Sequence, residues 1–134
     1  MLLVCADCKR EVPEEDMSHQ TVWGKDVTVK VDSELAYAKG MVSRRQNVVE
    51  SLGLEGSSAE AVGAYRSLAG CLREVLKHHN NVMSMVNDAT AGAALESSLL
   101  VDSCRAWLAM SAQSCMSFGI SEDVLAGIRR EVRV

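Results

Sequence analysis

Aromatic side chains are scarce in this 134-residue chain: one Phe, two Trp and two Tyr make up 4% of its residues. With so few large rings, the core must be built from Ala, Leu, Val and Met. These side chains suit closely approaching helices better than a β-sandwich. The length is that of one domain, which excludes most two-domain enzymes. The 48% apolar content is enough to form a hydrophobic core without the help of disulfides or metal ions.

Long hydrophobic runs and an excess of basic charge are also missing. The longest uncharged run, Ala106 to Ser121, is interrupted by Ser and Gln and falls short of the roughly 18 apolar residues of a membrane span. Met1 to Val4 is too short for a signal peptide, so we expect a cytoplasmic protein with no membrane segment. Fourteen Lys and Arg against eighteen Asp and Glu give a net charge of −4, which disfavours nucleic acid as a partner.

Residues 1–32 differ in composition from the rest of the chain and predict a small β-hairpin. They contain the only proline, Pro13, and two β-rich runs, 21–23 and 27–31, joined by Gly24-Lys25-Asp26. Such runs around a short Gly-containing connection are typical of a hairpin. Because an isolated hairpin is marginal in water, this one must pack on the remaining chain or be held by a metal.

A CxxC motif, Cys5-Ala-Asp-Cys8, lies at the start of this segment. Two thiolates at this spacing can bind one edge of a tetrahedral Zn²⁺. The first 40 residues resemble the N-terminal zinc ribbon of antitoxin-type regulators, but Ala36 to Gly40 replace the second CxxC. The resemblance implies zinc held by Cys5 and Cys8; because the second CxxC is missing, His19 is a candidate third ligand. The alternative is a metal-free, degenerate hairpin. Further candidate ligands are the same thiols of a second copy, Cys71, His78 and His79. The odd, scattered set of five cysteines does not predict a disulfide framework.

Residues 33–134 predict a bundle of three to four helices, which makes the fold class mainly α. Ser33 and Glu34 can open a first helix that runs to Leu52, and Ser57 or Ser58 can cap the second. The second helix has an apolar stripe at helical spacing, formed by Ala61, Val62, Tyr65, Leu68, Ala69, Leu72, Val75 and Leu76. Asn80-Asn81 offers a turn, and Ser121 can cap a last helix over 122–132. Between them, Val82 to Met116 is nearly continuous helical pattern, which allows either one long helix or two in line that divide near residues 90–92.

No Lys or Arg occurs between Lys77 and Arg105, and the only acids there are Asp88, Glu96 and Asp102. A helix with so little charge and so many small side chains is expected to pack on more than one side. We therefore expect a homo-oligomer, most simply a twofold dimer.

The C-terminal third, Leu99 to Asp102 and Phe118 to Arg129, resembles the closing helices of all-α NTP pyrophosphohydrolases of the MazG-like class. That resemblance implies a Mg²⁺ site built from carboxylates, for which this chain offers Glu74, Glu96 and Asp102. The family's paired carboxylates are incomplete here, because position 99 is Leu and Glu74 is the only acid between Arg66 and Asn87.

The same C-terminal residues also fit a helix-turn-helix frame with Gly119 in the turn and residues 121–133 as the second helix. The first residues of a recognition helix meet DNA, and here Glu122 and Asp123 would meet phosphate with the wrong sign. A DNA-binding regulator is therefore a second alternative.

No nucleophile motif or phosphate-binding loop occurs in the sequence. His78 and His79 lie at a predicted helix C-terminus, where a capping role is expected. We therefore expect a non-catalytic regulatory or inhibitor-like protein, of the kind that mobile elements carry, which acts by binding a partner protein. The Mg²⁺-dependent pyrophosphohydrolase and the DNA-binding regulator stay open as alternatives.

Overall fold

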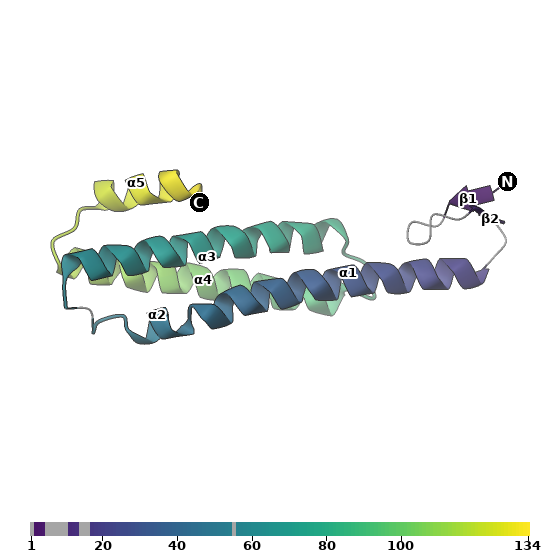
Figure 1. Cartoon of the computed structure of the whole chain (residues 1–134), viewed down its shortest axis with the longest axis horizontal. Helices are drawn as coiled ribbons and strands as arrows, with labels where there is room; N and C mark the ends of the chain where they lie inside the picture. Colours follow the sequence, from purple (N-terminus) through teal and green to yellow (C-terminus); the bar gives the residue numbers. More distant parts are fainter. Residues whose placement is uncertain (1, 5–10, 14–16, 55) are drawn as a thin grey trace.

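The computed structural model describes the backbone of residues 2–4, 11–13, 17–54 and 56–134, and side chains from residue 27 onward except residue 55. This part of the chain is mainly helical, in agreement with the predicted fold class (Figure 1). The elements are β1 (Leu2–Val4), β2 (Glu11–Pro13), α1 (Met17–Arg44), α2 (Gln46–Glu50), α3 (Ser58–Ser84), α4 (Ala91–Ser117) and α5 (Glu122–Val132).

Three long helices form the body of the protein. Helices α3 and α4 run antiparallel along most of their length, α1 lies beside both, and α5 folds back over α3 (Figure 1). The two short strands pair antiparallel, with Leu3 opposite Val12. One side of α4 is exposed between residues 95 and 113.

Local sequence signals set the ends of α3 and α5. The Ser57 hydroxyl accepts a hydrogen bond from the Glu60 backbone N–H at 3.2 Å, and Ser121 caps α5 in the same way through Val124. Both serines satisfy a backbone donor that has no partner inside the helix. Gly119 ends the preceding turn with a φ of 82°, a conformation that glycine adopts without a steric penalty. These boundaries were predicted.

The main core lies between α3 and α4. Tyr65, Leu68 and Val75 of α3 are almost fully buried, which confirms the predicted stripe. Helix α4 contributes residues that alternate at spacings of three and four: Ala94, Ser97, Val101, Cys104, Leu108, Ser111 and Cys115. Most of them are small, and small side chains let two helices approach closely, so the scarcity of aromatic residues fits the packing.

A second, smaller core cluster joins α1 to the other helices. It consists of Val31, Val82 and Ala94. Two predictions for this part of the chain were wrong. The prediction of a strand over residues 27–31 was wrong, because these residues belong to α1, and α1 does not begin at Ser33. Burial of Val31 against two neighbouring helices outweighs the strand preference of the local Val and Thr residues.

Two further boundaries differ from prediction. Helix α3 continues through Asn80 and Asn81 to Ser84, and the turn to α4 spans residues 85–90. Asn87 and Thr90 fix this turn, because the backbone N–H of each residue bonds to the side chain of the other, at 2.8 and 3.0 Å. Residues 82–84 thus belong to α3, and α4 begins only at Ala91. The first helix ends at Arg44 instead of Leu52.

None of the helices in the described part of the chain combines the length and the apolar character needed to cross a membrane.

Candidate functional site

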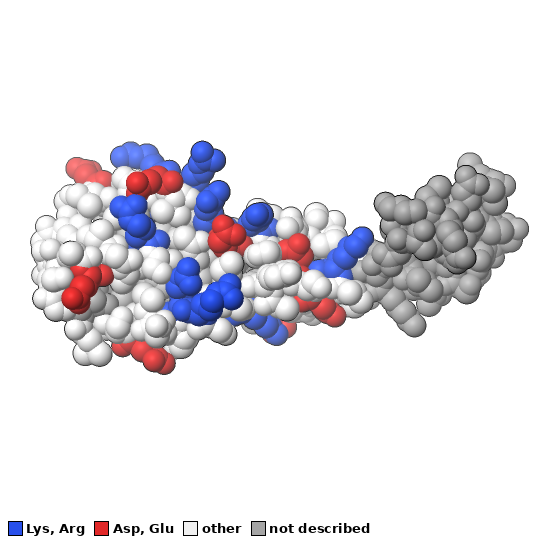
Figure 2. Space-filling model, viewed as in Figure 1, with Lys and Arg blue, Asp and Glu red and all other residues white. Residues whose placement is uncertain are grey.

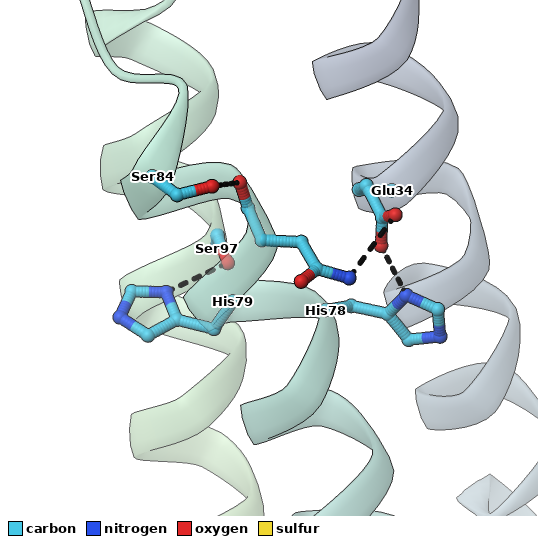
Figure 3. A network of polar contacts seen from close by, with 6 residues as sticks. Glu34, His78, His79, Ser84 and Ser97 are labelled. Carbon is cyan, nitrogen blue, oxygen red and sulfur yellow. Dashed lines mark hydrogen bonds and ion pairs between the residues drawn. The ribbon is translucent and has the colours of Figure 1, made fainter.

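A cluster of polar side chains lies where α1, α3 and α4 meet (Figure 3). Glu34 of α1 forms an ion pair with His78 of α3 and accepts a hydrogen bond from the Asn81 amide at 3.2 Å. The ring of Tyr37 stacks on the His78 imidazole with a centroid distance of 5.6 Å. His78 is thus held by α1 through two side chains one helical turn apart, which locks α1 onto α3.

The pKa of the Glu34 carboxyl shows how this cluster is balanced. Partial burial raises that pKa, but the hydrogen bonds from His78 and Asn81 and the electrostatic effects of His78 and Lys77 together lower it below its ordinary value of 4.5. Glu34 is therefore ionised at neutral pH. The side chains that bind the carboxylate favour its charged form. Glu34 therefore holds α1 against α3 through charged hydrogen bonds.

His79 points to the other side of α3, toward α4 (Figure 3). Its Nδ1 lies 2.9 Å from the Ser97 hydroxyl oxygen. A Ser–His contact is the core of many nucleophilic sites, but Ser97 is fully buried and so has no access to a substrate. The prediction that the two histidines cap a helix end was wrong. They lie inside α3 and contact different helices.

The predicted zinc site cannot be compared with the structure. Cys5 and Cys8 lie outside the described residues, and so does the side chain of His19. Among the side chains that are described, no group of three or more His, Cys, Asp or Glu residues could hold a metal ion.

The three carboxylates predicted for Mg²⁺ are all described, and they are not brought together. Glu96 of α4 pairs with Lys39 of α1. Asp102 is exposed on the outer side of α4, whereas Glu74 is half-buried on α3. Each carboxylate thus has its own surroundings, and no shared cation site is formed by them.

Two cysteine thiols lie next to each other in the core. The Sγ atoms of Cys71 and Cys104 are 3.9 Å apart, and Cys71 also donates a weak hydrogen bond to the Met41 carbonyl. The hydrogen bond with Cys71 and burial both raise the pKa of the Cys104 thiol. The same hydrogen bond lowers the pKa of the Cys71 thiol. These thiols pack between α3, α4 and α1, and sequence spacing gave no signal that they would meet.

Helix α5, the candidate recognition helix, is attached to α3. Arg129 donates a hydrogen bond to the Tyr65 hydroxyl at 2.7 Å and pairs with Glu122 at 2.5 Å. Arg133 lines a shallow depression with Arg73 and Lys77 of α3. Basic and acidic side chains are interspersed over the face shown in Figure 2, so this face has no extended field of one sign.

The outer side of α4 is a feature that the sequence did not assign to a site. We call it the outward face: Leu95, Leu99, Asp102, Ala106, Met110 and Gln113, all of which are exposed. These residues recur at spacings of three and four, on the side of the helix opposite its buried stripe. Leu95 is 64% exposed and Leu99 is 56% exposed. Helix α4 therefore has one apolar side in the core and a second one in contact with solvent.

Searches with models of protein families, among curated proteins and among solved structures found no match.

Proposed function

We propose that this chain is a non-catalytic interaction protein, which acts by binding another protein chain through the outward face of α4. The observation that carries the proposal is the exposure of two leucines and Met110 on a helix side with a single charge, Asp102. Apolar surface gains free energy when it leaves water, at about 25 cal/mol per Å². Exposed apolar patches on otherwise folded proteins mark interaction sites.

The geometry of the outward face suits a partner helix. Spacings of three and four place its residues along a narrow stripe, as in the contact line of a helical pair. Its edges are weakly charged, since residues 78–104 contain no Lys or Arg. A partner with a complementary apolar stripe can therefore approach α4 without desolvating many charges.

The polar groups that could carry chemistry serve the fold, which supports a binding role. Glu34 and His78 hold α1 on α3, Glu96 pairs with Lys39, and Ser97 is buried against His79. Each of these groups already has a partner in another helix.

Photocrosslinking in the cells that make the protein tests the proposal. A photoreactive phenylalanine analogue is placed at position 99 of the outward face, or at position 124 of α5 as a matched control. Leu99 and Val124 have similar exposure, 56% and 49%, but Val124 lies outside the outward face. We expect a discrete protein adduct from position 99 and none from position 124.

A second variant separates specific binding from chance collision. This variant carries Leu95→Asp in addition to the photoreactive residue at position 99. The new charge lies one helical turn from position 99 and should abolish the adduct. Equal adduct formation at positions 99 and 124, or no adduct at 99, would overturn the proposed function. Mass spectrometry of the adduct also identifies whether the bound chain is a second copy or another protein.

A further inference from the structure

We infer that Cys71 and Cys104 are a peroxide-reactive pair, whose thiols join in an intramolecular disulfide that ties α3 to α4. Their Sγ atoms lie 3.9 Å apart on facing helices, although the two residues are 33 positions apart in the sequence. Cys104 belongs to the buried stripe of α4, on the side opposite the outward face. The inference is therefore independent of the proposed binding function.

The geometry brings the two sulfur atoms close to bonding distance. An S–S bond is about 2.05 Å long, so each sulfur must move by about 1 Å toward the other. Rotation about the two Cα–Cβ bonds, with a small approach of the helices, supplies this movement. The buried stripe of α4 favours the approach, because small residues such as Ser97 share it.

The surroundings of the two thiols differ, which gives them different roles. The hydrogen bond from Cys104 lowers the pKa of the Cys71 thiol, burial raises it, and the charges of Arg45 and Arg44 lower it, so that it falls below its ordinary value of 9.0. The same hydrogen bond and burial raise the pKa of Cys104. Because the thiolate is the form that attacks peroxide, Cys71 is the attacking thiol and Cys104 completes the disulfide.

Arg45 adds an independent observation beside Cys71. It lies at the break between α1 and α2, and its Nε is buried with no hydrogen-bond partner in the part of the chain that the structure describes. Buried donors without a partner are rare. A thiolate on Cys71 supplies a negative charge close to this guanidinium.

Hydrogen peroxide is the oxidant, and two steps consume it. The Cys71 thiolate attacks one peroxide oxygen, the O–O bond breaks, and the released hydroxide takes a proton to become water. Cys71 is then a sulfenic acid. The Cys104 sulfur attacks the Cys71 sulfur, the S–O bond breaks, and the leaving oxygen takes the Cys104 proton and that of the sulfenic acid as a second water. Two thiols and one peroxide thus give one disulfide and two waters.

The end of α1 offers a route to Cys71. The thiol donates to the Met41 carbonyl at 3.7 Å, and α1 ends three residues later at Arg44. Helix ends open more often than helix centres. Hydrogen peroxide is close to water in size, so a brief opening of this last turn admits it more readily than it admits iodoacetamide.

Peroxide treatment of the full chain tests the inference. Remaining thiols are then blocked in acidic urea, and trypsin places the three cysteines of the core in separate peptides: Cys71 in 67–73, Cys104 in 78–105 and Cys115 in 106–129. We expect peptides 67–73 and 78–105 to be linked within one chain. Dithiothreitol should release them.

The same treatment in urea is the matched control. Shorter loops close more easily in an unfolded chain, and Cys104 is nearer in sequence to Cys115 than to Cys71. In urea we therefore expect the link from Cys104 to Cys115 to exceed the link from Cys104 to Cys71. In the folded chain the link to Cys71 should dominate by at least about tenfold, because the two thiols are already in contact.

Variants separate the roles of the groups, with circular dichroism as the check on folding. Cys104→Ser should leave Cys71 as a sulfenic acid that dimedone captures, whereas Cys71→Ser should give no capture at Cys104. Arg45→Gln should slow the link at least about threefold. Arg130→Gln, on α5, should leave its rate unchanged.

Three results would overturn the inference. The first is a folded chain that forms no link between peptides 67–73 and 78–105, and the second is the same ratio of links with and without urea. The third is dimedone capture at Cys104 of the Cys71→Ser chain as fast as at Cys71 of the Cys104→Ser chain.

Discussion

The Glu34 carboxylate of α1 is paired with the His78 imidazole of α3, and the Asn81 amide one turn later binds the other carboxylate oxygen. The pKa of Glu34 is lowered in the folded protein, so this contact stabilises the fold when the pH is above the ordinary pKa of a glutamic acid. Its contribution is lost as the pH falls through the lowered pKa.

Glu34→Gln should therefore lower the free energy of unfolding by about 1 kcal/mol at neutral pH. The difference from the unaltered chain should shrink in acid. Urea unfolding at about pH 7, about pH 5 and about pH 3 measures it. The control is Glu50→Gln, because Glu50 is exposed on α2. A difference that stays the same from neutral pH to strong acid would contradict the assigned role of the carboxylate.

Arg129 attaches α5 to the body of the protein through the hydroxyl of the buried Tyr65. Arg129→Met should cost about 1–3 kcal/mol, since the phenol loses its hydrogen-bond partner. Proteolysis within residues 122–132 should become faster because α5 detaches more often.

A double-mutant cycle isolates this contact. Tyr65→Phe should cost less in the Arg129→Met chain than in the unaltered chain, whereas Arg130→Gln, at an exposed position of α5, should change stability little. Additive effects of the Tyr65 and Arg129 substitutions would show that the two side chains do not interact.

Leu68 and Leu54 are a matched pair for testing the core. Leu68 is 1% exposed and Leu54 is 80% exposed. Leu68→Ala should lower the free energy of unfolding by about 2–5 kcal/mol through lost burial and a residual cavity. Leu54→Ala should change it by less than about 0.5 kcal/mol. Similar costs at the two positions would contradict the placement of the α3 stripe in the core.

The thiols of Cys71, Cys104 and Cys115 are buried, and the pKa of Cys104 is raised. Burial keeps the reagent from all three sulfur atoms, so alkylation should be slow in the folded protein and fast in urea. Peptide mass mapping after brief iodoacetamide treatment follows each thiol separately. Rapid alkylation of Cys104 without urea would show that α3 and α4 do not pack as described.

The sequence predicted the fold where one local signal decided the outcome. Periodicity predicted the stripe that contains Tyr65 and Leu68. Single residues predicted the Ser57 and Ser121 caps and the Gly119 turn. The structure has all of these features. The start of α1 and the end of α3 depend on distant contacts. Val31 becomes helical through burial on Val82, which no window around residue 31 reveals.

The site was harder to predict for a related reason. The absence of Lys and Arg from residues 78–104 predicted a helix packed on several sides, but not which side of α4 meets α3. That side is fixed by the alternation of Val101, Cys104 and Leu108 in the core, which leaves Leu95 and Leu99 outside. Likewise, His78 and His79 looked like capping residues until α1 and α4 supplied Glu34 and Ser97 as their partners.

Hydroxyl-radical footprinting of the unaltered chain, at high dilution and at high concentration, tests most directly whether the outward face of α4 is covered by protein. Leu95, Leu99 and Met110 report on that face, while Leu54 and Val124 are exposed elsewhere. We predict that modification of the first three residues slows as the concentration rises, whereas modification of the other two keeps its rate. Equal rates for all five residues at every concentration would contradict the homo-oligomer that the sequence predicts, with the outward face of α4 as its contact surface.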